Sequence, residues 1–263
     1  MNKASVKIKY IYSKIIWKYR RIASKYLFRR IFNINLPCAI ISFSFDDAPE
    51  TAFTNGGEIL KKYDAVATYY MSLGKLGIES PSGPIATYEV LINAIKEGHE
   101  LGCHTFDHRH SWETKTENFV ESVVKNRETL SSLIPNSQFQ SLAYPICDPK
   151  PATKLKMSKL FECCRGGDQG FNIGPTDLNL LNAFFLDSRI GDPIDKIKVL
   201  IDQNTKEKGW LIFATHDVDD RPSKYGCSKN FLEKTVCHSV QSGSLLLPVG
   251  KACNYILNQK MPK

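Results

Sequence analysis

The sequence predicts an α/β fold in which strands and helices alternate and the strands form a mostly parallel sheet, open or closed into a barrel. Short apolar segments alternate with amphipathic helical segments over about 220 residues. Polar side chains also follow four of the predicted strands, at the carboxyl ends where βα barrels carry their sites. With 263 residues, 42% of them hydrophobic, the chain is long enough to form a large core.

Residues 5–32 predict an amphipathic helix. Apolar and aromatic residues recur at spacings of four and three and share one helix face: Ile8, Tyr12, Ile15, Tyr19, Ile22 and Tyr26. Basic residues flank this face: Lys7, Lys14, Lys18, Arg21 and Lys25. Such a helix can lie on an anionic membrane surface, or it can pack on the domain or on a partner subunit. We expect the membrane surface, because the first 45 residues contain no acidic residue.

The segments that follow alternate between strands and helices. Residues 38–45 and 65–71 are short, apolar and rich in β-branched or aromatic residues, which predicts strands. Residues 56–63 and 86–97 have helical patterns, and the second helix ends at Gly98.

The second half of the chain continues this alternation. Residues 99–103 predict a short strand that ends in a histidine motif, and a helix over 113–133 begins after Ser111 and stops before Pro135. Further strands are predicted at 139–144, 182–187, 210–215 and 244–247, and further helices at 152–160, 192–207 and 229–241.

The positive charge of the chain lies mainly in its first segment. The formal net charge is +8, yet residues 1–30 hold ten of the 35 basic residues and no acidic one. The remaining 25 basic residues face 27 acidic residues, so the body is nearly neutral and we expect no nucleic-acid partner. We divide the chain into a basic helical arm, residues 1–35, and a barrel domain, residues 36–263.

The cysteines and the apolar runs bear on the compartment. The eight cysteines include no CxxC pair, which argues against a cysteine zinc site and favours a reducing compartment. Basic residues interrupt every apolar run near the N-terminus, so neither a secretory signal nor a membrane span is expected. We expect a cytoplasmic protein, peripheral on the inner face of the membrane.

Four groups of polar residues follow predicted strands and should meet at one mouth of the barrel. They are Asp46-Asp47, His104 with His108, Tyr144-Pro145 and His216-Asp217. Two imidazoles and one carboxylate suit zinc, and also iron, cobalt or nickel. Taken alone, a His-x-x-x-His pair is a weak signal that is more often structural. Adjacent aspartates can share a site only where the strand has ended.

Two of these groups carry a resemblance to a known family. Ser44-Phe-Asp-Asp47 and His104-Thr-Phe-Asp-His108 resemble the first two motifs of the NodB-like polysaccharide deacetylases, carbohydrate esterase family 4. Leu142-Ala-Tyr-Pro145 and the strand ending at His216 are similar to the third and fifth motifs, and the likeness covers about residues 36–255.

The resemblance implies a distorted (β/α) barrel and a metal-dependent hydrolase that removes an N-acetyl group from an amino sugar in a glycan or glycan precursor. It implies that Asp47, His104 and His108 hold the metal, which we expect to be zinc, with cobalt or nickel as alternatives. It implies that Asp46 is the general base and His216 the general acid, and that the backbone N–H of Tyr144 stabilises the oxyanion.

The sequence departs from the family pattern at the third motif. Ala143 stands where the family has an arginine that holds the base aspartate, and Arg165 is our candidate to replace it from the next strand end. The fourth-motif aspartate is unclear, with Asp187 and Asp192 as candidates.

Three readings of the function remain at this point. The first is an N-deacetylase that acts at the cytoplasmic face of a bacterial membrane. The second is an O-acetyl esterase or a cyclic amide hydrolase on the same fold. The third is a catalytically inactive, membrane-associated sugar-binding homologue, and its only support is the missing arginine.

Overall fold

The computed structural model describes residues 3–259, with side chains from residue 12 onward. The main sheet has eight strands in the order β10-β11-β2-β3-β6-β7-β8, with β12 also paired to β2. All of its strand pairs are parallel. The strands are β2 (Ile40–Phe45), β3 (Ala67–Met71), β6 (Glu100–Cys103), β7 (Ser141–Ala143), β8 (Cys163–Arg165), β10 (Phe184–Phe185), β11 (Trp210–Thr215) and β12 (Leu245–Leu246).

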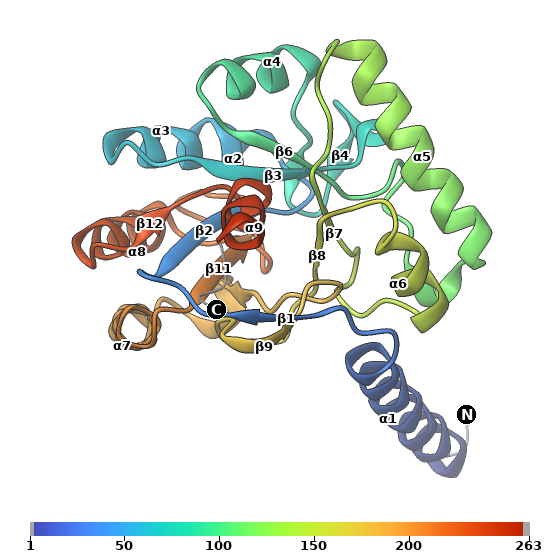
Figure 1. The fold of residues 1–263 in the computed structure, drawn as a ribbon. Coiled ribbons are helices and arrows are strands. Elements are labelled where there is room, and N and C mark those ends of the chain that lie inside the picture. The colour runs from blue at the N-terminus through green and yellow to red at the C-terminus, as the bar shows by residue number, and fades with distance from the viewer. Residues whose placement is uncertain (1–2, 260–263) are drawn as a thin grey trace.

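The sheet curls until its two edges approach one another. A parallel bridge joins Arg165 of β8 to Leu181, just before the opposite edge strand β10. Helices surround the curled sheet (Figure 1). They are α2 (Glu50–Phe53), α3 (Asn55–Lys62), α4 (Tyr88–Lys96), α5 (Thr116–Leu133), α6 (Pro151–Met157), α7 (Ile194–Glu207) and α8 (Lys229–Gln241). The predicted distorted (β/α) barrel is confirmed.

The last helix, α9 (Val249–Asn258), lies against the amino-terminal halves of the strands. The N–H of Val249 donates to Thr68 Oγ1 at 2.8 Å, and the N–H of Gly250 donates to Glu100 Oε1 at 2.9 Å. These bonds satisfy orphan donors at the start of the helix. The carboxyl ends of the strands, where the predicted site lies, are left uncovered by α9.

Apolar side chains form the core on both faces of the sheet. Ile41, Phe43 and Phe45 belong to a large cluster that includes buried residues of α3 and α8, such as Leu60 and Phe231. Ile40, Trp210 and Ile212 belong to a second cluster with residues of α9. Strands buried on both faces are expected to be nearly continuous apolar runs, and β2 and β11 are buried throughout.

Two short antiparallel strand pairs and three 3-10 turns were not predicted. β1 (Ile31–Ile34) pairs antiparallel with β9 (Gly174–Asp177), and β4 (Glu79–Ser80) pairs antiparallel with β5 (Gly83–Pro84). The 3-10 turns are η1 (Leu73–Lys75), η2 (Ser111–Glu113) and η3 (Ser188–Ile190). Each is too short to leave a periodic pattern in the sequence.

The N-terminal amphipathic helix is confirmed, but it is shorter than predicted. Helix α1 spans Lys3–Tyr26 and projects away from the barrel (Figure 1). The predicted end at residue 32 is wrong, because Phe28 adopts a left-handed conformation (φ 49°) and residues 31–34 form β1. The domain division at residue 35 stays a prediction. Lys7 and Ile8 lie outside the described side chains.

The predicted apolar face of α1 is exposed over its described part. Tyr12, Ile15, Tyr19, Ile22 and Tyr26 have exposed fractions between 49% and 65%. Near its C-terminal end the helix is attached to the barrel, where Arg21 and Lys25 contact Asp168 and the Ser24 carbonyl accepts a hydrogen bond from Lys154. No helix of the described chain is long and apolar enough to cross a bilayer.

Candidate active site

The chain turns sharply after β2, and this turn brings two adjacent aspartates into one cavity. The N–H of Asp46 still donates to Thr215 of β11 at 2.8 Å, whereas Asp47 and Ala48 have φ of 56° and 47°. Left-handed backbone costs an L-residue other than glycine about 1–2 kcal/mol, so it persists only where the surroundings enforce it. Because the strand has ended, the two side chains do not diverge as on a strand, and both line the cavity.

The two histidines follow β6 in a loop rather than on a helix. The Nδ1 of His104 lies 2.8 Å from the carbonyl oxygen of Ala143, so it donates there and leaves Nε2 free to bind a metal. His108 has a φ of 57°, which turns it back toward His104, and the two ring centroids lie 5.0 Å apart. Burial lowers the pKa of His104 to about 4, so the ring is neutral near neutral pH, as a ligand must be.

Asp47, His104 and His108 form a set that can hold a divalent metal. Their ligand atoms all lie within 4.8 Å of one another. Asp47 Oδ1 is 3.4 Å from His108 Nε2 and 3.9 Å from His104 Nε2. Two ligand atoms that each lie about 2.0–2.2 Å from the same ion are separated from one another by distances of this size. The donor set therefore fits a zinc-like metal.

Asp46 is buried and paired with Arg165. The guanidinium of Arg165 donates through Nη2 to Asp46 Oδ1 and through Nη1 to the carbonyl of Gly166 at 2.9 Å. Burial opposes ionisation of Asp46, but the charges of Arg165, His104 and His216 hold the pKa of this carboxyl below its usual value. Arg165 therefore lies where the sequence predicted a replacement for the missing arginine, and Asp46 is ionised at neutral pH.

His216 lies across the same cavity, at the end of β11. Its Nδ1 lies 3.2 Å from the carbonyl oxygen of Tyr225, which orients the ring and leaves Nε2 available. The cavity has a volume of about 580 Å³, within the range of small-ligand sites. Its lining residues are Asp46, Asp47, Lys75, Ser80, Pro81, Ser82, Ile85, His104, His108, Ile146, Cys147, Gly167, Gln169, Phe185, Arg189, His216 and Tyr225.

The structure does not bring the N–H of Tyr144 to the cavity. This N–H donates to the carbonyl of Arg165 at 3.0 Å in the pairing of β7 with β8, so the oxyanion assignment requires correction. Pro145 has no N–H, and the next donor in the chain belongs to Ile146, which lines the cavity. No acceptor for the Ile146 N–H is found among the described residues.

Four aspartates close to the histidines in sequence or considered for the fourth motif have contacts of their own. Asp107 accepts from Ser122 and Arg109, and Asp217 accepts from the N–H and hydroxyl of Ser223. Asp187 accepts from Arg189, whose guanidinium lies over the Tyr225 ring. Asp192 accepts from Ser228. The contacts of Asp107, Asp192 and Asp217 thus hold neighbouring segments together, and Asp187 is linked to the cavity through Arg189, which lines it.

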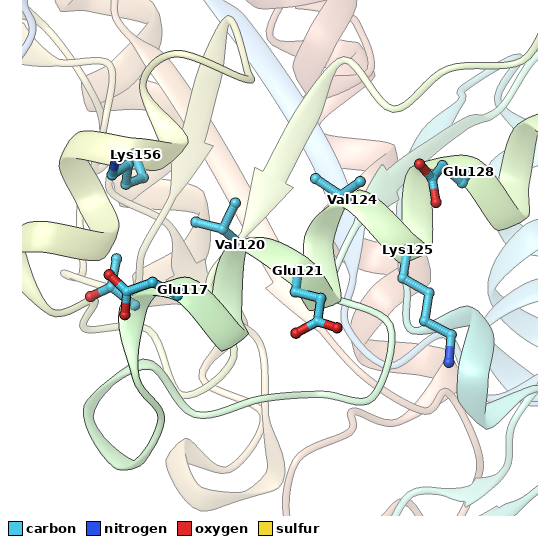
Figure 2. A pocket seen from close by; sticks show the side chains of 8 residues that line it. Glu117, Val120, Glu121, Val124, Lys125, Glu128 and Lys156 are labelled. Carbon is cyan, nitrogen blue, oxygen red and sulfur yellow. The ribbon is translucent and has the colours of Figure 1, made fainter.

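A second hollow, of about 550 Å³, lies on the surface of α5 near Lys156 of α6 (Figure 2). Glutamates, a lysine and two valines of α5 line it, including Glu117, Val120 and Lys125. None of its lining residues lines the cavity with the aspartates and histidines. It brings together neither a metal-ligand set nor a nucleophile–base pair, so we assign no chemistry to it.

Comparison with known proteins supports the resemblance. The family described as polysaccharide deacetylase matches residues 33–160. A peptidoglycan-N-acetylglucosamine deacetylase of Bacillus cereus is 30% identical over 90 residues, which cover 34% of this chain and 38% of that protein. The chain thus matches well under half the length of this curated relative.

Solved structures extend the likeness to most of the chain. The chitin deacetylase of Colletotrichum lindemuthianum superposes with a TM-score of 0.59 at 16% identity, covering 84% of this chain and 90% of that one. A family 4 acetyl xylan esterase of Clostridium thermocellum, in complex with a cobalt ion, gives a TM-score of 0.58 at 13% identity, covering 82% and 91%. At these identities the likeness shows the shared fold. The chain is therefore similar to polysaccharide deacetylases in sequence over residues 33–160 and in fold over most of its length.

Proposed function

We propose that this protein is a metal-dependent hydrolase that removes the N-acetyl group from an amino sugar. One observation carries the proposal. A metal-ligand set, an ionised buried carboxylate and an oriented histidine line a single cavity at the carboxyl ends of the strands. A binding protein would need neither the Arg165–Asp46 pair nor a third histidine across the cavity from the two ligand histidines.

Each residue has a distinct task in amide hydrolysis. Asp46 accepts a proton from the attacking water, and Arg165 keeps it ionised for this purpose. His216 donates a proton to the leaving nitrogen, because an amine departs poorly as an anion. The Ile146 N–H is available to donate to the developing oxyanion. A divalent metal held by Asp47, His104 and His108 would acidify the water and polarise the carbonyl.

We propose zinc as the metal, with cobalt or nickel as alternatives, because two imidazoles and a carboxylate suit these ions. Elemental analysis of purified protein tests the assignment. We expect near-stoichiometric metal in the wild type and almost none in His104→Ala/His108→Ala. His238→Ala, which alters a histidine outside the cavity, should keep its metal. Full occupancy in the double variant would overturn the ligand assignment.

We propose that the enzyme works on a glycan or glycan precursor at the cytoplasmic face of a bacterial membrane. The exposed apolar face of α1, flanked by Lys18, Arg21 and Lys25, supports binding to anionic lipids. Arg21 and Lys25 contact Asp168, whose neighbours Gly167 and Gln169 line the cavity, so a surface-bound helix would keep the cavity near the lipid. All eight cysteines are free, which agrees with a reducing compartment.

Vesicle sedimentation tests the membrane proposal. Wild-type protein should pellet with vesicles of phosphatidylglycerol and much less with neutral phosphatidylcholine vesicles. The Tyr12→Ser/Ile15→Ser/Ile22→Ser variant should remain in the supernatant. A matched control, Val199→Ser, removes an exposed apolar side chain on α7 and should pellet like wild type. Equal pelleting of the triple variant would contradict the proposal.

A further inference from the structure

We propose that the sugar substrate carries an anionic group, a phosphate or a carboxylate, and that Lys75 binds it. The proposal rests on the proposed deacetylase function and specifies its substrate class. It starts from a charge that no other described side chain neutralises.

Lys75 is a half-buried cation in the wall of the catalytic cavity. It ends the 3-10 turn η1 after β3 and lines the cavity together with Asp46, Asp47 and the ligand histidines. Its ammonium group forms no hydrogen bond or ion pair within the part of the chain that the structure describes. Glu79, the nearest acid along the chain, is exposed and does not line the cavity.

The other cations of the cavity have carboxylate partners. Arg165, behind the wall, is paired with Asp46, and Arg189, in the wall, is paired with Asp187. These two pairs cancel, so the remaining charges are Asp47 and Lys75. A divalent metal on Asp47 would make the net charge of the cavity positive. An uncharged sugar would leave this charge unmatched, whereas an anionic sugar would neutralise it.

The chemistry of an ammonium group suits this role. Lysine is a compact point charge with three donors, and it binds phosphate and carboxylate oxygens through charge-assisted hydrogen bonds. Lys75 comes from the loop between β3 and β4, outside the turns that supply the metal ligands. It can therefore contact a part of the sugar away from the scissile amide. Such a contact selects the substrate without taking part in the hydrolysis itself.

Calorimetric binding to the His216→Gln protein, loaded with zinc, tests the proposal with turnover suppressed and the Arg165–Asp46 pair intact. The probes are N-acetylglucosamine 1-phosphate, N-acetylmuramic acid and uncharged N-acetylglucosamine. The phosphate and carboxylate probes separate the two sources of charge. The Lys75→Met, Lys75→Arg and Lys96→Met changes are each added to this protein, and Lys96→Met removes an exposed lysine outside the cavity.

We expect at least one anionic probe to bind about tenfold or more tightly than the neutral sugar, with a preference that weakens as salt is raised. Lys75→Met should abolish this preference, while Lys75→Arg and Lys96→Met retain it. Equal binding of all three probes, or a preference that survives Lys75→Met, would overturn the proposal. The binding measurement does not depend on hydrolysis. A failure of the wild-type protein to release acetate would therefore count against the deacetylase function, while the effect of Lys75 on anion binding could still be interpreted.

Discussion

Two arginine–aspartate contacts in this protein have the same chemistry and opposite surroundings. Arg165 and Asp46 meet in the catalytic cavity, where their side chains are 1% and 6% exposed. Arg21 and Asp168 meet where helix α1 joins the barrel, at 2.5 Å, with side chains 48% and 30% exposed. The Arg165 guanidinium of the first pair lies over the Tyr70 and Phe185 rings, whereas the second pair is open to solvent and shares Asp168 with Lys25.

The difference teaches what each contact can do. A buried pair has no water to replace a lost partner, so it fixes the ionisation and position of Asp46. An exposed pair exchanges readily with water and salt, so it attaches α1 weakly. The same two residue types thus determine the chemistry in one region and a salt-sensitive attachment in the other.

Removing the buried arginine should have the largest effect. Arg165→Met leaves the Asp46 carboxylate buried without its partner, which should lower the free energy of unfolding by about 3–5 kcal/mol and reduce turnover by at least about a hundredfold. Chemical denaturation and acetate release measure the two effects. Arg21→Met is the matched control and should change the free energy of unfolding and the turnover only slightly. Similar losses in the two variants would contradict the contrast between the pairs.

The pH dependence of stability sharpens the comparison. The folded-state pKa of Asp46 lies below its ordinary value of 3.8. The stability that ionised Asp46 contributes to the fold is therefore fully present above that value and is lost as pH falls through the folded-state pKa. The difference in unfolding free energy between wild type and Arg165→Met should therefore shrink below about pH 4. Denaturation of metal-free protein across a pH series measures it. A difference that stays constant to pH 3 would show that the pair does not control this ionisation.

The exposed pair should give the smallest effect. Asp168→Asn removes the partner of Arg21 and Lys25, and it should change the free energy of unfolding by less than about 1 kcal/mol at low salt and by less still at high salt. Thermal unfolding at two ionic strengths measures it. A loss of several kcal/mol that persists in high salt would mean that α1 is an integral part of the barrel.

Local sequence motifs predicted the parts of the site that depend on one strand end. Asp46 with Asp47 and His104 with His108 each sit on a single turn, so their spacing along the chain limits where they can lie. The helix over Lys229–Gln241 and the strand over Trp210–Thr215 were likewise predicted at their observed bounds, because each has clear end signals.

Contacts between distant segments were harder to predict. Arg165 and Asp46 are 119 residues apart, and only the pairing of β7 with β8 shows that β8 lies beside the third motif. In the same strand pairing the N–H of Tyr144 donates to the carbonyl of Arg165. This contact depends on the register of β7 against β8, which the sequence alone does not give. The signal for Ile146 was already present, because a proline at residue 145 has no donor of its own.

The helix α1 shows a different limit. Its periodicity predicted the helix and its apolar face, which the structure shows to be exposed, but the pattern alone did not indicate where the helix ends. The end of the helix depends on β1, which pairs with β9, a strand more than a hundred residues later in the sequence.

Acetate release from an N-acetylated amino sugar, by wild type and Asp46→Asn with the metal content of both measured, tests the central claim most directly. We predict that the two proteins hold equal metal and that turnover in the variant falls by about 10²–10⁴-fold. The control Asp64→Asn, in an exposed turn, should match wild type. Undiminished acetate release by Asp46→Asn with its metal in place would contradict the assignment of Asp46 as the base.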